Sequence, residues 1–329
     1  MSYIVLKPDI LLHNISVMQD VCRKQGIRLV IVTKAVCSHP AVAELCAAAR
    51  VSSIADAHIE SSVFLTERRI PAELLQMRLS DIPSVCDEAK NISRVYISDE
   101  ALLCALRGAE HVPDIMLAIE AGDGRDGIAP ERLAAVIREN AGLPLRGVSA
   151  QWGCMTKRLP DARSFRLLEQ AADIFEQSTG RKAAVAAGGT VLAPHILCGA
   201  LPSGITEVRI GEAVLTGFDS VCGQPVFGMR QDAWQLYAHI VEAKPAAPRG
   251  GKPRLRCVLD IGSLAAPLKG LIRDNPDIVF HGQTFDYTAA ELSETRKTEA
   301  NTVRLNVGYE TLAGCFIHPY VDKKLPEVE

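Results

Sequence analysis

Short apolar runs alternate with amphipathic segments along the chain from residue 28 to about residue 210. Eight of these runs are rich in aliphatic and β-branched residues and predict buried strands. Apolar residues at helical spacing fill the segments between them, as in residues 40–49, 130–139 and 162–177, and predict helices. The eight predicted strands are residues 28–33, 52–55, 74–79, 94–97, 115–120, 145–150, 183–187 and 207–210.

This alternation predicts an α/β fold with a closed, TIM-like (β/α)8 barrel, because eight strands joined by seven helices is the count of such a barrel. An open, doubly wound sheet is the alternative fold for the same order of elements. A further helix, predicted over residues 8–25, precedes the first strand and is expected to reach across to the barrel.

The last third of the chain has a different character. Proline and glycine cluster in residues 244–251, and the apolar runs that remain, such as residues 236–241 and 303–307, are short and alternate with polar positions. Such runs between turn-forming residues are typical of antiparallel strands. We therefore predict two domains, the barrel with its N-terminal helix in residues 1–222 and a smaller, mainly antiparallel β domain in residues 223–329.

The bulk composition is that of a globular protein with a sizeable core. Of the 329 residues, 48% are hydrophobic and 23% are charged, which excludes a disordered chain. The net charge of −3 and the 5% of aromatic residues disfavour nucleic acid as a partner. No apolar run is long enough to span a membrane and no signal peptide is evident, so we expect a cytoplasmic protein without a membrane partner.

The ten cysteines are scattered along the chain rather than paired. None forms the C-x-x-C spacing of a zinc site or a redox pair, and no tight group suggests a disulfide framework. We predict that most of them are small, buried hydrophobic residues and that the protein has no metal site.

Barrel enzymes place their active sites on the loops that follow the strands, and Lys34 occupies the first of these positions. Val30, Ile31 and Val32 form the apolar strand before it. Burial against such a strand disfavours the ammonium form of a lysine, and a neutral amine is what a Schiff base requires. The alternative is a lysine that extends along the rim of its strand to the solvent.

Polar residues or glycines follow the other predicted strands as well. Glycines follow the seventh and eighth strands, where barrel proteins often bind a phosphate through backbone N–H groups. Such glycines are also common in ordinary tight turns, and the arginines could instead form ion pairs with nearby aspartates. The strand-end residues that carry candidate chemistry are Asp56, His58, Arg78, Arg125, Gln151, Cys154, Gly188, Gly189, Thr190, Arg209, Gly211 and Glu212.

Taken together, a lysine amine, a phosphate-binding loop and several arginines fit one cofactor, pyridoxal 5′-phosphate. The lysine would form a Schiff base with it, the glycine loops would take its phosphate, and charged groups would tune its ring.

The order and spacing of these motifs resemble those of the fold-type III pyridoxal phosphate enzymes, the alanine racemase group, and most closely its ornithine-racemase-like branch. The resemblance extends in one order over nearly the whole chain. Lys34 after the first strand, and Arg209 with Gly211 after the eighth, are its most specific parts. The matching segments are residues 32–35 (VTKA), 54–56 (IAD), 122–127 (GDGRDG), 188–189 (GG), 208–213 (VRIGEA), 282–286 (GQTFD) and 318–321 (HPYV).

The resemblance implies a role for each matching residue. Lys34 would hold the cofactor as an aldimine and would also serve as one of two acid–base groups. Arg209 would hydrogen-bond the pyridine nitrogen, Arg125 would lie near the ring hydroxyl and the substrate carboxylate, and Gln151 would lie beside the ring. The residues expected to bind the phosphate are Gly189, Thr190, Gly211, Glu212 and Tyr320.

The resemblance also implies a head-to-tail homodimer with active-site residues shared across the interface. The chain departs from it at the second acid–base group. In alanine racemase this group is a tyrosine from the C-terminal domain of the neighbouring subunit, and Ser263 stands at the matching position here. A serine is a poor general base. Tyr287 is our first candidate to replace the tyrosine, ahead of Cys154, Tyr309 and His281.

We therefore expect an amino-acid racemase that interconverts L- and D-amino acids, with ornithine, lysine or a related small molecule as substrate, through a Lys34 aldimine. His58 stands where ornithine-type relatives are expected to carry an arginine, so a basic substrate rests on the resemblance alone. The missing tyrosine leaves a pyridoxal phosphate-dependent decarboxylase or aldolase of the same fold as an alternative. A non-catalytic carrier of the cofactor is a third hypothesis.

Overall fold

The computed structural model describes residues 1–77, 92–249, 252–298 and 300–326. Its larger part is a closed barrel of parallel strands, in which each strand pairs with the next and the last pairs with the first. The predicted barrel is thereby confirmed over the open sheet. The barrel strands are β2 (Arg28–Val32), β3 (Ser53–Asp56), β4 (Glu73–Gln76), β5 (Ile92–Ile97), β6 (Asp114–Ala118), β7 (Leu145–Gln151), β8 (Ala184–Gly188) and β9 (Glu207–Ile210).

Side chains alternate between the two faces of the barrel wall, as the period of a strand requires. On β2, Leu29 and Ile31 pack in the main hydrophobic core, which lies between the barrel and its helices. Val30 and Val32 belong to a separate apolar cluster, to which five other barrel strands contribute. This second cluster fills the inside of the barrel.

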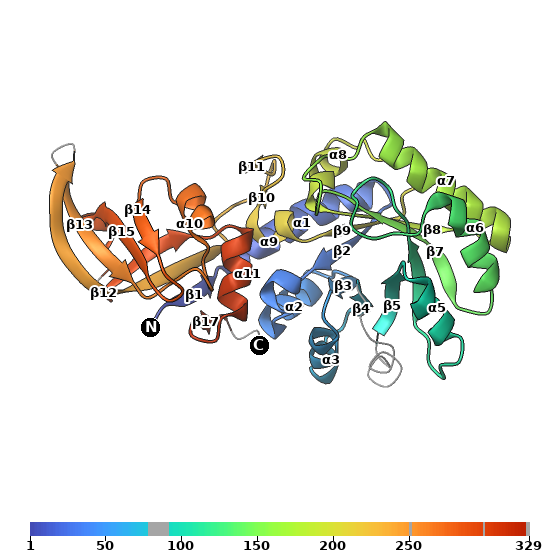
Figure 1. Cartoon of the computed structure of the whole chain (residues 1–329), viewed down its shortest axis with the longest axis horizontal. Coiled ribbons are helices and arrows are strands. Elements are labelled where there is room, and N and C mark those ends of the chain that lie inside the picture. Colours follow the sequence, from blue (N-terminus) through green and yellow to red (C-terminus); the bar gives the residue numbers. More distant parts are fainter. Residues whose placement is uncertain (78–91, 250–251, 299, 327–329) are drawn as a thin grey trace.

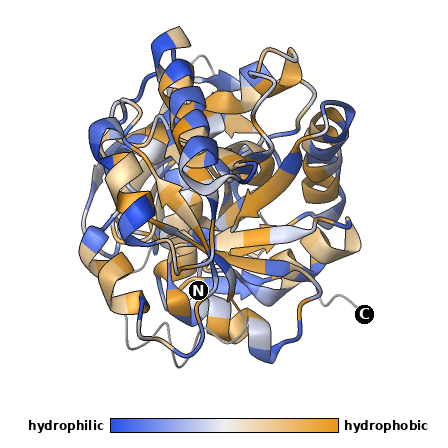
Figure 2. Cartoon of the chain, turned by 90° about the vertical axis from the view of Figure 1, so that its right-hand side faces the viewer, coloured by the Kyte–Doolittle hydropathy of each residue, from blue (hydrophilic) through white to orange (hydrophobic). Residues whose placement is uncertain are grey.

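Helices cover the outside of the barrel, and Figure 2 shows hydrophilic and hydrophobic stretches along them. Three begin on a proline, whose fixed φ and missing N–H suit the first helical turn: α1 (Pro8–Lys24), α2 (Pro40–Ala48) and α6 (Pro130–Glu139). Within the described residues, no helix is long and apolar enough to cross a membrane. The other helices around the barrel are α3 (Ile59–Glu67), α5 (Glu100–Leu106), α7 (Ala162–Thr179), α8 (Ala193–Leu197) and α9 (Glu212–Thr216).

The smaller part of the molecule is a seven-stranded sheet beside the barrel (Figure 1). Its strand order is β14-β15-β13-β12-β1-β17, with β16 paired to β12. The pairs are antiparallel except β1 with β17, which confirms the predicted β domain. The elements of this part are β1 (Tyr3–Leu6), β12 (Trp234–Arg249), β13 (Lys252–Leu259), α10 (Leu268–Asp274), β14 (Val279–Gln283), β15 (Thr288–Ser293), β16 (Thr302–Asn306), α11 (Tyr309–Ile317) and β17 (Asp322–Lys324), and a small hairpin of β10 (Phe218–Asp219) and β11 (Gln224–Pro225) precedes it.

Both ends of the chain belong to this sheet. β1 pairs with β12 and β17, whereas α1, which follows β1, packs on the barrel. Within the proline- and glycine-rich segment, residues 244–249 belong to β12, which pairs with β13. Pro245 pairs with Leu255 of β13, while the pairing of β12 with β16 stops at His239. Pro245 therefore stands where a missing N–H breaks no described pair on the far side of β12.

Helix α11 joins the sheet to the mouth of the barrel. It packs on a 3-10 turn, Lys34–Val36, that follows β2. Phe316 of α11 meets His39 edge-to-face, with ring centres 5.9 Å apart, and meets Trp234 in the same way at 5.5 Å. These contacts bring Tyr309, the first residue of α11, to the carboxyl ends of the barrel strands.

Candidate active site

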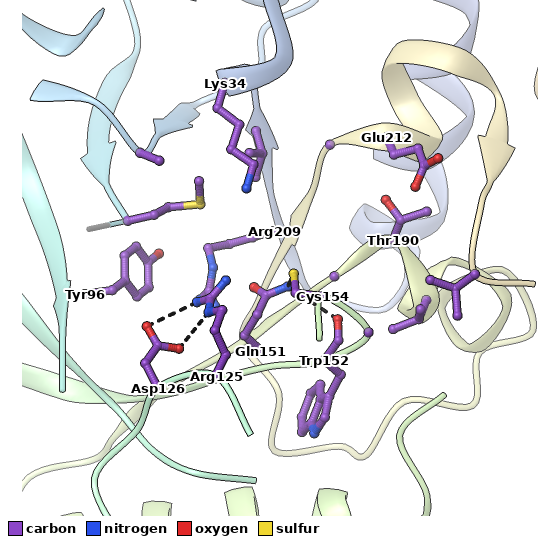
Figure 3. Close-up of a pocket in the computed structure, with 18 of the residues that line it drawn as sticks. Lys34, Tyr96, Arg125, Asp126, Gln151, Trp152, Cys154, Thr190, Arg209 and Glu212 are labelled. Carbon is purple, nitrogen blue, oxygen red and sulfur yellow. Dashed lines mark hydrogen bonds and ion pairs between the residues drawn. The ribbon is translucent and has the colours of Figure 1, made fainter. Parts of the chain in front are cut away.

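A cavity of about 650 Å³ lies at the carboxyl ends of the barrel strands (Figure 3). Loops that follow the strands and the start of α11 form its walls, as in barrel enzymes generally. Most of the predicted strand-end residues meet there. Those that line it are Lys34, Arg125, Gln151, Cys154, Gly189, Thr190, Arg209, Gly211 and Glu212.

Lys34 begins the 3-10 turn directly after β2, and its Nζ points into the cavity (Figure 3). Hydrogen bonds behind the lysine hold this turn. The Ser38 hydroxyl lies 2.7 Å from that of Thr33 and donates to the Asp56 carboxylate at 2.5 Å, and all three residues are buried. Ser38 has a φ of 45°, which residues other than glycine adopt uncommonly. The network thus fixes the backbone from which Lys34 projects.

Asp56 serves this turn rather than the cavity. Its carboxylate also accepts hydrogen bonds from the backbone N–H groups of Ala57 at 2.6 Å and His58 at 2.9 Å. Nδ1 of His58 lies 3.4 Å from the same carboxylate, and the His58 side chain is mostly exposed. Ala57 lines the cavity, whereas the Asp56 and His58 side chains do not form part of its wall.

Arg209, on β9, is buried, with 5% of its surface exposed. Its Nη2 donates to the carbonyl of Ala150 at 3.1 Å, and its guanidinium carbon stands 4.2 Å from the centre of the Tyr96 ring. Nη1 is buried and has no hydrogen-bond partner among the described residues. A buried donor without a partner is costly, so this atom calls for an acceptor on a ligand.

Glycines after β8 and β9 shape the wall beside Arg209. A Cβ on Gly188 would lie 2.7 Å from Arg209 Nη2, and a Cβ on Gly189, whose φ is 123°, would lie 2.3 Å from a backbone oxygen. The Thr190 hydroxyl accepts a hydrogen bond from the N–H of Ala213 at 3.3 Å, which joins the loops after the two strands. Because only glycine fits at positions 188 and 189, backbone groups can approach a ligand closely here.

Glu212 lies on the same side of the cavity as Thr190 (Figure 3). Its carboxylate accepts a hydrogen bond from the Ser220 hydroxyl at 2.9 Å. Burial raises the pKa of Glu212 to about 7; the hydrogen bond from Ser220 lowers it and the nearby Asp219 carboxylate raises it. At neutral pH, Glu212 is therefore partly protonated, unlike an exposed glutamate.

Arg125 and Asp126 form another part of the wall and are paired, with Nε and Oδ1 2.8 Å apart. Burial lowers the pKa of Arg125, but the hydrogen bond with Asp126 outweighs it and the net pKa is raised, so the guanidinium stays charged. The buried Asp123 carboxylate accepts a hydrogen bond from the Thr156 hydroxyl at 3.1 Å and ties this loop to the next one. Arg125 therefore forms an ion pair with a nearby aspartate, which was the alternative role for the strand-end arginines, and it lines the cavity as well.

Gln151 ends β7, and Cys154 follows it in the next loop. Nε2 of Gln151 lies 3.4 Å from Cys154 Sγ and 3.4 Å from the carbonyl oxygen of Trp152. The Trp152 indole N–H donates to the carbonyl of Ala121 at 2.9 Å, which fixes the loop against its neighbour. A rigid loop therefore holds an amide and a thiol beside Arg209 (Figure 3).

Several predicted site residues lie outside this cavity, among them both exposed tyrosines. Tyr287 is 48% exposed in the turn between β14 and β15, and Tyr320 is 71% exposed between α11 and β17. Tyr309 lines the cavity, and burial raises its pKa. His281, on β14, has its Nε2 3.6 Å from a carboxylate oxygen of Glu291. Arg78 lies outside the described residues.

Several lining residues escaped the sequence analysis, and Tyr96 and Ser220 are two of them. Tyr96 lies within β5 rather than after it. The candidate site residues were taken only from the ends of the predicted strands, so Tyr96 was not among them. The signal that could have found it is the alternation of Arg94, Val95, Tyr96 and Ile97, in which the polar and aromatic positions share the inner face.

The described part of the chain contains no group of three or more histidine, cysteine, aspartate or glutamate side chains that could hold a metal ion. The nine cysteines in this part are all free. Four of them are buried and three are exposed, so the prediction that most are buried was wrong. Cys104, for example, lies on an outer helix, where the apolar pattern does not distinguish the core face from its border.

Two curated relatives match nearly the whole chain. Ornithine racemase from Acetoanaerobium sticklandii is 24% identical in an alignment 345 positions long. The alignment covers 95% of this chain and 96% of the relative. Lysine racemase from Thermotoga maritima is 22% identical over 327 residues, which cover 92% of each protein.

Solved structures share the fold. D-threonine aldolase from Filomicrobium marinum superimposes with a TM-score of 0.76 at 17% identity, over 98% of this chain and 91% of that one. Alanine racemase from Corynebacterium glutamicum superimposes with a TM-score of 0.76 at 16% identity, over 99% of each chain. Residues 6–217, which include all the barrel strands, match the family described as alanine racemase, N-terminal domain. The chain belongs to this family.

Proposed function

We propose that this protein is a pyridoxal 5′-phosphate-dependent amino-acid racemase that interconverts the L- and D-forms of ornithine, lysine or a related amino acid. The observation that carries the proposal is the presence of Lys34 and Arg209 at one cavity, with Arg209 Nη1 left without a partner among the described residues. The racemase activities named for the two relatives, which align over more than nine-tenths of this chain, support it.

The cavity residues fit this cofactor, a planar ring that carries an aldehyde, a phosphate and a ring nitrogen. Lys34 would hold the aldehyde carbon, Arg209 Nη1 would donate to the ring nitrogen, and Arg125 would lie toward the ring hydroxyl and the substrate carboxylate. Gln151 would lie beside the ring. The phosphate would be bound on the side of the cavity away from Tyr96 (Figure 3), by Gly189, Thr190, Gly211 and Glu212, with Tyr309 nearer than the exposed Tyr320.

The cofactor, when bound, supplies an electron sink for the bonding electrons at the substrate Cα. The Arg209 guanidinium can only donate hydrogen bonds, so it keeps a proton off the ring nitrogen. This limits the strength of the electron sink and favours the return of a proton to Cα over transamination. The Lys34 amine takes up and returns that proton on one face of Cα.

Racemisation needs a second proton-transferring group on the other face of Cα, and we assign Tyr287 to this role. Tyr287 is exposed on the β domain, so a head-to-tail homodimer would be needed to bring Tyr287 of the partner subunit to this cavity. Within the cavity, Tyr309 is a poor base at neutral pH because burial raises its pKa. Cys154 is the second candidate. In this arrangement the predicted domains, residues 1–222 and 223–329, would each supply one half of the site, except that β1 at the start of the chain belongs to the sheet of the second domain.

The experiment is a panel of L-amino acids incubated with the purified protein and pyridoxal phosphate in deuterium oxide, followed by chiral chromatography and mass spectrometry. A D-amino acid with deuterium at Cα is expected and names the substrate. A deuterated amine would indicate a decarboxylase instead. A bound cofactor without Cα exchange on any amino acid would contradict the proposal and favour a carrier, and failure to bind the cofactor would contradict it altogether.

A further inference from the structure

A buried carboxylate, paired with two arginines, lies at the amino ends of the barrel strands. Glu207, the first residue of β9, is 2% exposed. Its carboxylate accepts hydrogen bonds from Arg28 at 2.5 Å, from Arg94 at 2.7 Å and from the Tyr96 hydroxyl at 2.6 Å. Burial raises the pKa of Glu207, but the two arginines outweigh burial and the net pKa is lowered, so the carboxylate stays ionised.

Tyr96 connects this buried carboxylate to the cavity. Its neighbours Val95 and Ile97 pack in the outer core, so the alternation on β5 directs Tyr96 into the barrel. The hydroxyl of Tyr96 donates to Glu207, while its ring lies 4.2 Å from the guanidinium carbon of Arg209. Both side chains are buried, and a buried guanidinium over an aromatic ring is held by a favourable cation–π contact.

Backbone atoms of β7 and β8 confine the Nη2 end of the Arg209 guanidinium. Nη2 donates to the carbonyl of Ala150 at 3.1 Å, and a Cβ on Gly188 would come within 2.7 Å of the same nitrogen. The Tyr96 ring therefore holds the guanidinium plane, and β7 and β8 hold Nη2. Nη1 is left without a partner in the described part of the chain.

We propose that Tyr96, anchored by Glu207, is a positioning residue that fixes the Arg209 guanidinium and so directs Nη1 to the ring nitrogen of the cofactor. This inference deepens the proposed function and rests on it. Without the anchored ring, the guanidinium is free to turn, and the ring nitrogen loses the donor that keeps a proton off it. Burial raises the pKa of Tyr96 to about 12, so Tyr96 remains a phenol and acts through Arg209 rather than as an acid–base group.

Three variants separate the role of the Tyr96 hydroxyl from that of its ring. Tyr96→Phe keeps the ring and removes the hydroxyl that bonds Glu207, and Tyr96→Leu removes both. Tyr237→Phe is the matched control, because the Tyr237 hydroxyl donates to the Gln235 side chain at 3.1 Å in the β sheet, outside the cavity. For each holoenzyme we would measure the dissociation constant of pyridoxal phosphate, its visible absorbance, the ratio of transamination to racemisation, and the melting temperature.

We expect the ratio of transamination to racemisation and the dissociation constant to rise from wild type to Tyr96→Phe to Tyr96→Leu. The change should reach about 30-fold in Tyr96→Leu, the equivalent of losing a desolvated cation–π contact. Tyr237→Phe should leave both quantities at the wild-type level. If Tyr96→Leu does not fold, the same ratio in Tyr96→Phe decides.

Two results would overturn the inference alone. One is a Tyr96 variant whose cofactor affinity, absorbance and reaction ratio equal those of wild type. The other is a lowered melting temperature with an unchanged ratio, which would leave Tyr96 a purely structural residue. A wild-type protein that binds no pyridoxal phosphate would instead contradict the proposed function, and the inference with it.

Discussion

The two sides of the proposed site are built in different ways. Lys34 and Arg209 stand on barrel strands or directly after them, and buried hydrogen bonds and close backbone contacts fix their surroundings. Tyr287 stands on a turn of the β domain and is 48% exposed, together with Leu264 at 58% and Phe285 at 70%. Neighbouring exposed apolar side chains are typical of surfaces that contact another molecule. Cofactor binding should therefore be a property of one chain, and proton transfer on the second face of Cα a property of a pair.

The exposed turn has a defined geometry of its own. The Ser263 N–H donates to the carbonyl of Thr284 at 2.9 Å, and the Thr284 N–H donates to the carbonyl of Tyr287 at 2.8 Å. A Cβ on Gly262 would lie 2.0 Å from the carbonyl oxygen of Phe285. Tyr287 thus lies in the same hydrogen-bonded pair of loops as Ser263, where the resemblance to alanine racemase leads us to expect the tyrosine. This contact supports Tyr287 as its replacement.

The largest effect should come from Lys34→Ala, which removes the central group of the barrel side. Borohydride treatment should no longer fix the cofactor to the protein, and racemisation should fall by more than about 10³-fold, since nucleophile and base are lost together. Peptide mass spectrometry after reduction is the measurement. Lys157→Ala, at a second lysine of the same cavity, is the control and should retain the attached cofactor. Attachment that persists in Lys34→Ala would refute the site assignment.

Tyr287→Phe should break the other side and leave the barrel side intact. We expect kcat to fall by about 10²- to 10⁴-fold, the range of a general acid–base group, with cofactor affinity and absorbance unchanged. Exchange of Cα–H in deuterium oxide should persist for one enantiomer only, because Lys34 still serves its own face. Full racemase activity in Tyr287→Phe would shift the role to Cys154, which Cys154→Ala would then test.

Gly188→Ala should weaken the barrel side without removing a functional group. The added Cβ would lie 2.2 Å from Gln151 Oε1 and 2.7 Å from Arg209 Nη2, so both side chains must move. We expect the dissociation constant of pyridoxal phosphate to rise tenfold or more, as a strained contact of about 1–3 kcal/mol implies. Gly204→Ala, where nothing lies within 4 Å of the added Cβ, is the control for equilibrium titration. Equal affinities in the two variants would show that Arg209 is not confined there.

The smallest effect should be a pH dependence of cofactor binding. Burial raises the pKa of Glu212 to about 7, so its carboxyl is neutral below this pH and charged above it. A charged carboxylate repels a phosphate, so we expect the affinity for pyridoxal phosphate to fall several-fold as the pH rises through 7. The stability of the fold should also decrease as the pH rises. Between the unfolded pKa near 4.5 and the folded pKa of about 7, the folded state holds a proton that the unfolded chain has lost. The free energy of unfolding therefore declines across that window. Fluorescence titrations at pH 6–9 should show the change in wild type and not in Glu212→Gln; a wild-type slope that survives in the variant would assign it to another group.

Sequence patterns alone predicted most of the barrel side. The apolar runs marked the strands, and strands of a barrel all end on one side, so Lys34, Arg125, Gln151 and Arg209 meet at one cavity. Asp56 shows the limit of this rule. It ends strand β3, but its carboxylate accepts hydrogen bonds from Ser38, in the turn after β2, and from its own loop, and no periodic pattern reports such bonding.

Features that depend on contacts between distant segments could not be predicted. β1 and β17 are too short for a periodic signal, and they pair only because the two ends of the chain meet in the sheet. Tyr309 and Tyr320 flank α11, and the packing of this helix on the Lys34–Val36 turn decides that Tyr309 lines the cavity. Tyr96 lies inside a strand, where a search of strand ends does not reach.

The most direct test of a racemase site divided between two copies is complementation of two inactive variants. Lys34→Ala and Tyr287→Phe, each carrying a different affinity tag, would be co-expressed and assayed for racemisation with each variant alone as reference. In a head-to-tail dimer, half of the dimers are mixed and each mixed dimer has one site with both residues intact, so the mixture should regain about a quarter of wild-type activity. Activity no higher than that of the separate variants would contradict the divided site.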